Sequence, residues 1–347
     1  MAVSFLAAAC GEAKRATPPD TTTNLESADA ASPPIGPGEA YLPVPDGRIW
    51  YKKTGAGTGG PVILLHGGPG YNSFYLKSLE ALGDDRPVIR YDQLGGGRSG
   101  PMTDTSQMTI AHFVRELDSL RSALGYDRVH LLGHSWGTIL GFEYYRAHPR
   151  HVASLTLASA ALDMPAWERN TRRLVGTLSD SAQRAIKLRE AERKFDAPDY
   201  QQALEEFYGK YVWRQPVEAD LDSTIRMANM QIYNYMQGPS EFTITGTLKT
   251  YDVTPLLKTI TVPALYTVGE FDEADPPTIR RFASLTPGAT VEVIPGAAHT
   301  TTWDNPEAML RVVRRFLRKV EVGATSSRAQ RGTSLAPARS LAALGMR

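Results

Sequence analysis

Cysteine is almost absent from this 347-residue sequence, with Cys10 as the single example. One thiol can form neither an internal disulfide nor a cysteine-based metal site. An excess of one charge is also missing, because 38 Lys and Arg residues stand against 37 Asp and Glu residues, and no basic stripe suggests a nucleic-acid partner. No run of 18 or more apolar residues indicates a membrane span.

Metal-ligand spacing is equally scarce among the seven histidines. His148 and His151 form the one suitable pair, and they flank Pro149 at the exit of an expected helix, where a solvated surface is the simpler interpretation. We therefore expect no metal and no other cofactor.

Both ends of the chain have compositions that do not suit a packed core. Residues 1–38 begin with small apolar side chains and continue rich in Pro, Thr, Ser and Ala, which predicts a signal-like or disordered leader. Within it, Leu6-Ala7-Ala8-Ala9-Cys10-Gly11 resembles the end of a bacterial lipoprotein signal, so a protein exported with a lipid anchor at Cys10 and a cytoplasmic protein are both open. Residues 323–347 have no acidic side chain and are predicted to be a disordered basic tail.

Between these ends, strand and helix patterns alternate. Asp46-Gly47 between two apolar runs predicts a β-hairpin over 39–53. Further strands are expected at 61–65, 87–91, 128–133, 152–157, 262–268 and 290–294, with helices at 109–124, 138–146 and 306–320. Such alternation indicates βαβ units, an α/β fold and a mostly parallel sheet.

The pattern changes after residue 163, because no strand signal appears before about 237. Charged amphipathic segments at 165–176, 179–194, 199–213 and 217–236 predict an inserted helical cap instead. We therefore expect a core made of 39–162 and 246–322 with a cap at 163–245. In open α/β sheets the site lies at the carboxyl ends of the strands, and the cap would cover it.

The central motif of the chain is Leu132-Gly133-His134-Ser135-Trp136-Gly137. It reads Gly-x-Ser-x-Gly between an expected strand and an expected helix, the context of a nucleophile elbow. Glycines at 133 and 137 let strand and helix pass close to the serine. Ser135 is therefore the candidate nucleophile.

A serine nucleophile needs a base and an acid that orients the base. After an elbow these follow in the order acid, then histidine, each just beyond a strand. His299 is the one histidine in the last half of the chain, and it follows the strand that ends at Ile294. The strand ending at Val268 is followed by four possible acids, of which position favours Asp272 or Glu270 over Glu273 and Asp275.

An oxyanion hole would combine the N–H of Trp136 with an N–H from the loop 66–70, where Gly68 is our choice. A plain tight turn is the alternative for that loop. Asp92 and Gln93, with the glycines at 95–97, either support the floor of the site or form a structural turn.

Five strings together resemble the proline iminopeptidase family of α/β hydrolases, over about residues 40–320. They are His-Gly-Gly-Pro-Gly at 66–70, Tyr-Asp-Gln-x-Gly-x-Gly-x-Ser at 91–99, Gly-x-Ser-Trp-Gly at 133–137, Gly-Pro-Ser-Glu-Phe-Thr-Ile-Thr-Gly at 238–246 and Gly-Glu-Phe-Asp-Glu at 269–273. The resemblance implies an α/β-hydrolase fold with an inserted cap and a triad of Ser135, Asp272 and His299.

The resemblance also implies how a substrate is held. In related enzymes two glutamates bind the free α-amino group, and the matching positions here are Glu241 and Glu273. Two carboxylates in a dry pocket suit an ammonium group, because charge-assisted hydrogen bonds are strong. Candidate walls for the side chain of the released residue are Tyr233, Tyr235, Phe242, Trp136 and Trp303.

Two departures leave the preferred residue open. His134 stands where members of the family often have Gln, and Gly96 stands where they often have Cys. The expected activity is a serine aminopeptidase acting, through an acyl-enzyme, on a small peptide or aminoacyl amide with a free amino group. The alternatives are an amino-acid amidase, or an esterase or lactonase using the same triad, and a non-catalytic binding protein is a third class.

Overall fold

The computed structural model describes residues 36–333, which lie in one compact unit. The leader expected at 1–38, with its candidate lipidation site Cys10, falls almost wholly outside this range and stays a prediction. Within the described part of the chain, no helix is both long and apolar enough to cross a membrane.

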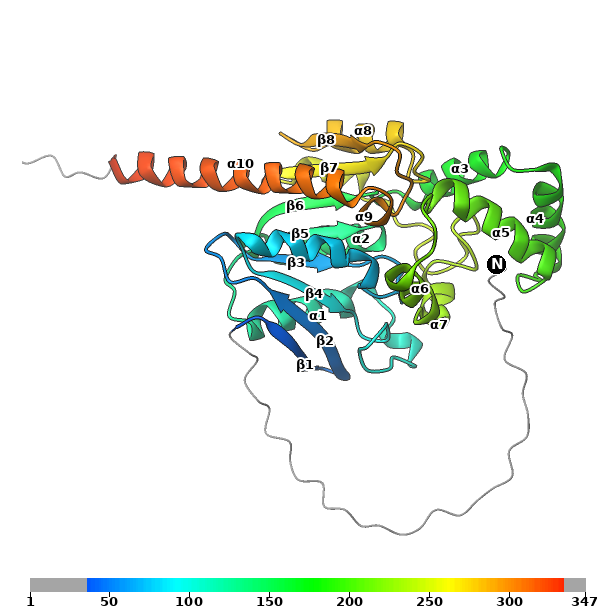
Figure 1. Ribbon diagram of the computed structural model, residues 1–347, viewed down its shortest axis with the longest axis horizontal. Coiled ribbons are helices and arrows are strands. Elements are labelled where there is room, and N and C mark those ends of the chain that lie inside the picture. The colour runs from blue at the N-terminus through cyan, green and yellow to red at the C-terminus, as the bar shows by residue number, and fades with distance from the viewer. Residues whose placement is uncertain (1–35, 334–347) are drawn as a thin grey trace, which may run out of the picture. The chain divides into compact units, whose positions relative to one another are not determined.

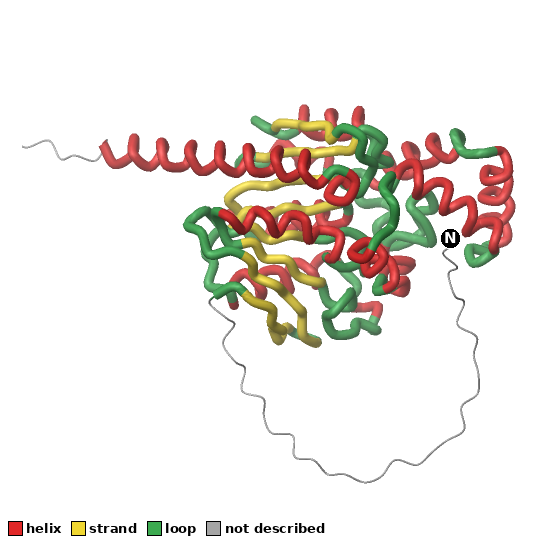
Figure 2. The backbone as a smooth tube through the Cα atoms, viewed as in Figure 1, coloured by secondary structure: helices red, strands yellow, loops and turns green. Residues whose placement is uncertain are grey.

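An eight-stranded sheet forms the centre of the described residues, in the order β1-β2-β4-β3-β5-β6-β7-β8 (Figure 2). The hairpin β1–β2 is antiparallel, β2 pairs antiparallel with β4, and every later pair is parallel. The strands are β1 Gly38–Val44, β2 Gly47–Thr54, β3 Val62–Leu65, β4 Val88–Asp92, β5 Val129–His134, β6 Val152–Ala158, β7 Ala264–Gly269 and β8 Thr290–Ile294. The predicted mostly parallel α/β sheet is confirmed.

Helices cover both faces of this sheet (Figure 1), which explains why β3, β4, β5 and β7 are buried along their whole length. One face packs against α1 Ile110–Ala123, α2 Trp136–Ala147 and α8 Pro276–Leu285, and the other against η1 Phe74–Asp84 and α10 Pro306–Thr333. The sequence patterns did not predict η1 or α8. Shorter turns of helix are η2 Thr105–Gln107, η3 Pro149–His151, η4 Thr254–Thr259 and α9 Thr301–Asp304.

The insertion after β6 is helical, as the amphipathic segments predict, and its helices gather at one end of the sheet (Figure 1). They are α3 Met164–Val175, α4 Asp180–Glu192, α5 Pro198–Tyr211, α6 Ala219–Arg226 and α7 Met230–Met236. The segment expected as one helix over 217–236 is divided, because Asn229 caps the start of a new helix. Phe207, Tyr200 and Phe242 belong to a separate apolar cluster inside the cap.

The last helix corrects one expectation. A helix to Val320 and a disordered tail from 323 were predicted, but α10 continues to Thr333. Glu321 fastens this helix to the loops that precede β3 and β4, accepting from the Gly60 N–H at 2.9 Å and from Arg86 Nη1 at 2.7 Å. No proline follows before Pro337, so nothing in the backbone chemistry stops the helix at 323. The rest of the predicted tail lies beyond the described residues.

Candidate active site

The elbow has the geometry that Gly-x-Ser-x-Gly predicts. Ser135 joins β5 to α2 with φ 54° and ψ −122°, a backbone conformation that is strained for a residue with a side chain. A Cβ at Gly133 would lie 2.1 Å from the Gly137 carbonyl oxygen, and a Cβ at Gly137 would lie 2.1 Å from the Leu65 carbonyl oxygen. Only glycine allows this close crossing of strand and helix, which places Ser135 at the start of α2.

Asp272 and His299 meet although 27 residues separate them. His299 Nδ1 lies 2.9 Å from Asp272 Oδ1, and both side chains are buried. Of the other candidate acids, Glu270 accepts from the Gly296 N–H at an exposed position, and Asp275 caps α8. Glu273 lies on the opposite side of the ring, 3.9 Å from His299 Nε2. The geometry therefore pairs His299 with Asp272, as the family resemblance implies.

The Asp272 carboxylate is held by more than the histidine. It accepts from Ser159 Oγ at 2.6 Å, from the Ala274 N–H at 2.8 Å and from the Gly269 N–H at 3.1 Å. Burial raises the pKa of Asp272, but His299 and the hydrogen bonds from Ser159 and Ala274 lower it by a larger amount. The pKa of Asp272 is therefore below its ordinary value. Ser159 was not predicted, although its place at the end of β6, next to the elbow, was a usable signal.

The oxyanion loop, defined as residues 66–71, lies directly against the nucleophile. A Cβ at Gly67 would lie 3.1 Å from Ser135 Cβ. The Gly67 N–H donates to the Tyr75 hydroxyl at 2.8 Å, which leaves the neighbouring Gly68 N–H as the loop's candidate donor to an oxyanion. Trp136 is the first residue of α2, and the N–H of such a residue has no acceptor one turn earlier.

His134 links this loop to the catalytic histidine. Its Nε2 lies 2.9 Å from the His299 carbonyl oxygen, so Nε2 carries the proton, and its Nδ1 accepts from the Tyr75 hydroxyl at 2.7 Å. Burial, with the nearby His299, lowers the pKa of His134 to about 3, which keeps the ring neutral. A series of hydrogen bonds thus runs from Gly67 through Tyr75 and His134 to His299. The sequence pointed to His134 only as a departure from the family pattern.

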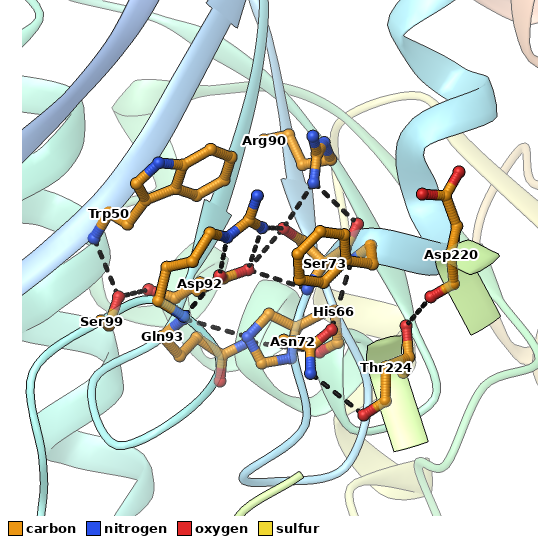
Figure 3. Close-up of polar contacts among 12 residues, drawn as sticks. Trp50, His66, Asn72, Ser73, Arg90, Asp92, Gln93, Ser99, Asp220 and Thr224 are labelled. Carbon is orange, nitrogen blue, oxygen red and sulfur yellow. Dashed lines mark hydrogen bonds and ion pairs between the residues drawn. The ribbon is translucent and has the colours of Figure 1, made fainter. Parts of the chain in front are cut away.

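The contacts of Gln93 favour the first of the two roles left open for it, support of the floor of the site. Gln93 Oε1 accepts from Trp136 Nε1 at 2.8 Å, and its Nε2 donates to the His66 carbonyl oxygen at 3.2 Å. The Gln93 N–H donates to His66 Nε2 at 3.0 Å (Figure 3). The residue after the nucleophile is therefore fixed to the start of the oxyanion loop.

Asp92 organises the polar network beside that floor (Figure 3). Its carboxylate accepts from Ser73 Oγ at 2.6 Å and from Arg98 Nε at 2.7 Å. Burial raises the pKa of Asp92, but Arg98 lowers it by more, so the group is ionised at neutral pH. Next to Ser73, Asn72 Nδ2 donates to the carbonyl oxygen of Thr224 in the cap at 3.1 Å. The network thus joins the core loops to α6.

The expected amine anchors lie close to one another and to His299. Glu273 is fully buried, and neither of its carboxylate oxygens has a hydrogen-bond partner within residues 36–333. Its Oε1 lies 3.9 Å from His299 Nε2. Burial raises the pKa of Glu273 well above the ordinary value, and the carboxylates of Glu241 and Asp272 add to this. A nearby positive charge would lower this pKa again, because an opposite charge favours the ionised form of a carboxyl group.

Glu241 is held by a tyrosine that was itself a candidate. Tyr233, 1% exposed, donates its hydroxyl to Glu241 Oε1 at 2.7 Å. Burial raises the pKa of Glu241, although His299 and the Tyr233 hydroxyl act in the opposite direction. The structure thus brings Glu241, Glu273 and Tyr233 together.

Three aromatic residues near these carboxylates were not predicted. Tyr71 stacks on Tyr233, with ring centroids 5.4 Å apart. Burial raises the pKa of Tyr208, and the negative charges of Glu241 and Glu273 raise it further. Trp167 on α3 meets the His299 ring edge-to-face at 5.3 Å and donates to the Glu241 carbonyl oxygen at 3.0 Å. Tyr71 could have been predicted, because it directly follows the 66–70 motif. Trp167 could not, because the sequence around it looks like any apolar position of an amphipathic helix.

The other expected pocket walls lie elsewhere. Tyr235 is 39% exposed, since two positions along α7 turn it away from Tyr233. Phe242 is fully buried in the cap cluster against Phe207, and the Trp136 indole packs into the main core against Phe113. Trp303 lies in a separate cavity of about 540 Å³, where it donates to the Pro216 carbonyl oxygen. These four residues were expected as walls for the side chain of the released residue, and the structure places their side chains in these other contacts.

The arrangement suits nucleophilic acyl transfer. A serine on a strained turn, an Asp–His pair and an N–H-rich loop converge beside the buried Glu273 carboxylate and the half-buried Glu241 carboxylate. In the part of the chain that the structure describes, no group of three or more His, Cys, Asp and Glu side chains is placed to hold a metal ion.

This fold and site define a class of protein, the α/β hydrolases, and a family model for the alpha/beta hydrolase fold matches residues 60–306. A proline iminopeptidase from Heyndrickxia coagulans is 41% identical over 285 residues, which is 81% of this chain and 99% of that protein. One from Saccharolobus solfataricus is 33% identical over 81% of this chain and 93% of its own. The crystal structure of proline iminopeptidase from Mycobacterium smegmatis matches with a TM-score of 0.76 at 33% identity, covering 83% of this chain and all of that one.

The chain therefore belongs to the proline iminopeptidase family of α/β hydrolases.

Proposed function

We propose that this protein is a serine aminopeptidase that releases an N-terminal residue, proline or another neutral residue, from peptides or aminoacyl amides. The observation that carries the proposal is Glu273, a buried carboxylate with no hydrogen-bond partner among the described residues, 3.9 Å from His299 Nε2. Leaving such a group unpaired costs stability. A cationic α-amino group of the substrate would satisfy it, whereas a simple ester gives the site no reason to keep it.

The chemical steps follow from the candidate triad. Ser135 Oγ attacks the scissile carbonyl carbon while His299 takes the hydroxyl proton, and Asp272 keeps the ring in the tautomer with hydrogen on Nδ1. The N–H groups of Gly68 and Trp136 stabilise the oxyanion. His299 then gives the proton to the departing amine, an acyl-enzyme remains on Ser135, and water, activated by the same histidine, releases the free amino acid.

Substrate selection is assigned to the two glutamates. An ammonium between Glu241 and Glu273 forms charge-assisted hydrogen bonds and returns the pKa of both carboxyls toward the ordinary range, because a nearby opposite charge favours the ionised form. Tyr233 orients Glu241 for this contact. The same anchor would serve an amino-acid amide, so amidase activity belongs to the same proposal, whereas an esterase or lactonase would not need the anchor.

The proposal is tested with alanyl and prolyl p-nitroanilides, their N-acetylated forms, an amino-acid amide and p-nitrophenyl acetate. We expect kcat/KM to be high for free amines and low for the N-acetylated forms. Ser135→Ala should remove turnover of all of them, by about 10⁶-fold. Glu273→Gln should lower kcat/KM for free amines by about tenfold to a hundredfold, the value of one hydrogen bond to a charged group.

The ester serves as the internal control, since it has no amino group to lose. If Glu273→Gln reduced ester and anilide cleavage equally, Glu273 would not be an amine anchor. If the wild-type protein cleaved N-acetylated substrates as fast as free ones, the aminopeptidase assignment would be wrong and the esterase alternative would take its place.

A further inference from the structure

Asn229, between α6 and α7 of the cap, contacts two core loops at once. Its backbone N–H donates to the Gly70 carbonyl oxygen at 2.8 Å, at the end of the oxyanion loop. Its side-chain Nδ2 donates to the Gly95 carbonyl oxygen at 2.9 Å. Its Oδ1 accepts from the N–H groups of Gln231 and Ile232 and so caps α7. All the polar groups of one side chain are therefore used where cap and core meet.

Asn229 and Ile232 pack closely against two glycines of the core loops. A Cβ at Gly70 would lie 2.6 Å from the Asn229 carbonyl oxygen, and a Cβ at Gly95 would lie 2.3 Å from Ile232 Cδ1. Both glycines also have positive φ, +83° and +86°. Beside this contact, Tyr71 stacks on Tyr233. The start of α7 is thus held against the oxyanion loop through both backbone and rings.

The rest of α7 holds Glu241, one of the two candidate amine anchors, in place. Tyr233 donates its hydroxyl to Glu241. At the end of the helix, the Gln237 carbonyl oxygen accepts from the N–H groups of Thr245 and Gly246 at 3.1 and 2.9 Å, which closes the loop that contains Glu241. A displacement of α7 would therefore move both Tyr233 and Glu241.

We infer that Asn229 is a positioning residue that fixes the amine anchor relative to the oxyanion loop and so helps determine selectivity for free amines; this inference rests on the proposed function. In an N-terminal residue one Cα atom alone separates the ammonium from the scissile carbonyl. The two must be bound at a distance set by covalent geometry, and a displacement of about 1 Å is costly. Asn229 sets that distance because it contacts the loop and begins the helix.

The test measures kcat and KM for alanyl p-nitroanilide and for p-nitrophenyl acetate in four proteins: wild type, Asn229→Ala, Glu241→Gln and the double variant. We expect Asn229→Ala to lower kcat/KM for the anilide about tenfold, on the scale of one weakened charge-assisted hydrogen bond, and to change ester cleavage less than about twofold. The double variant should be no worse on the anilide than Glu241→Gln alone, because both changes remove the same interaction.

Ser179→Ala is the matched control, since Ser179 caps α4 in the same cap and contacts neither α7 nor the catalytic loops. It should leave both activities unchanged. If Asn229→Ala does not fold, Asn229→Ser is used, which keeps a capping oxygen but cannot reach Gly95, and an amine-selective loss is again expected.

Equal losses on ester and anilide, no loss on either, or losses that multiply in the double variant would each overturn the inference. These outcomes are distinct from failure of the proposed function, which is seen in the wild-type protein as a lack of preference for free amines over N-acetylated substrates.

Discussion

At the residue scale, the site depends on side chains whose hydrogen-bond partners fix which atom donates and which atom accepts. His134 is the clearest case, because Nε2 must donate to a carbonyl oxygen and Nδ1 must therefore accept from Tyr75. The ring joins the oxyanion loop to the backbone of His299 without touching a reacting atom. Its two hydrogen bonds hold these two segments together.

Substitution of His134 should separate hydrogen bonding from packing. His134→Leu leaves the buried Tyr75 hydroxyl without its acceptor, which costs about 1–3 kcal/mol of unfolding free energy. The His299 carbonyl oxygen loses one donor but keeps Ser159 Oγ and the Thr301 N–H. We expect kcat to fall about tenfold or more for ester and anilide alike. His134→Gln, whose amide keeps one donor and one acceptor, should retain activity within a few-fold. Steady-state kinetics and urea denaturation would measure both effects.

The pH profile provides the control for this pair. Because the pKa of His134 is about 3, the ring is neutral at every pH where turnover can be measured. His134→Gln should therefore leave the acid limb of the kcat profile in place. A displaced limb would mean that His134 titrates during turnover, contrary to the positioning role.

At the element scale, the end of α5 and the segment after it are attached to the loop that bears His299, the candidate base. The Tyr211 carbonyl oxygen accepts from the His299 N–H at 3.1 Å, and the Val212 carbonyl oxygen accepts from the Thr300 N–H at 2.8 Å. Asp304 on α9 closes the contact, accepting from the N–H groups of Arg214 and Ala298, each at 2.7 Å. The cap therefore helps to hold the loop that bears His299 in place.

Removal of the Asp304 carboxylate should loosen both segments together. Asp304→Ala leaves the buried Ala298 N–H without its acceptor and removes the partly buried hydrogen bond to the Arg214 N–H. We expect the free energy of unfolding to fall by about 3 kcal/mol. Hydrogen exchange should quicken at 211–215 and at 298–304. Asp304→Asn keeps one acceptor oxygen and should have a smaller effect; faster exchange confined to one of the two segments would contradict the coupling.

At the scale of the whole molecule, the site combines loops from the carboxyl ends of β3, β4, β5, β6, β7 and β8 with the cap. Helices that pack on the faces of the sheet also support these loops through hydrogen bonds. Glu116 on α1 is one such support, since its Oε2 accepts from the Leu94 N–H at 2.9 Å. Its Oε1 has no hydrogen-bond partner within residues 36–333, and burial raises the pKa of Glu116 to about 8.

A raised carboxyl pKa makes the folded state hold its proton while the unfolded state has lost it. Between about pH 4.3, the ordinary Glu value, and about pH 8, Glu116 should therefore make stability fall as pH rises, by about 1.4 kcal/mol per pH unit. Glu116→Gln keeps an acceptor for Leu94 and should flatten this part of the curve, so the variant gains stability most at pH 8.

Chemical denaturation at a series of pH values measures the effect as the difference between variant and wild type. That difference isolates Glu116 from Glu241 and Glu273, whose raised pKa values act in the same direction. Curves that run parallel across pH 5–8 would show that Glu116 is ionised in the folded protein.

The sequence alone determined the local features. Alternating patterns placed the strands and most helices, the five-residue motif placed the elbow, and the order of elements after it selected His299. These succeeded because turn chemistry and apolar periodicity act over a few residues. The motif strings, by resemblance, selected Asp272 and the two glutamates, which the structure brings together with Tyr233.

Tertiary structure decided which side chains share the site. Phe242 and Tyr235 look equivalent to Tyr233 in the sequence, but packing buries one in the cap and exposes the other. His134, Ser159, Trp167 and Asn229 acquire their contacts from partners at least 100 residues away or, for His134 with Tyr75, 59 residues away in η1. Such contacts depend on how sheet and cap close over one another, and no local pattern contains that information.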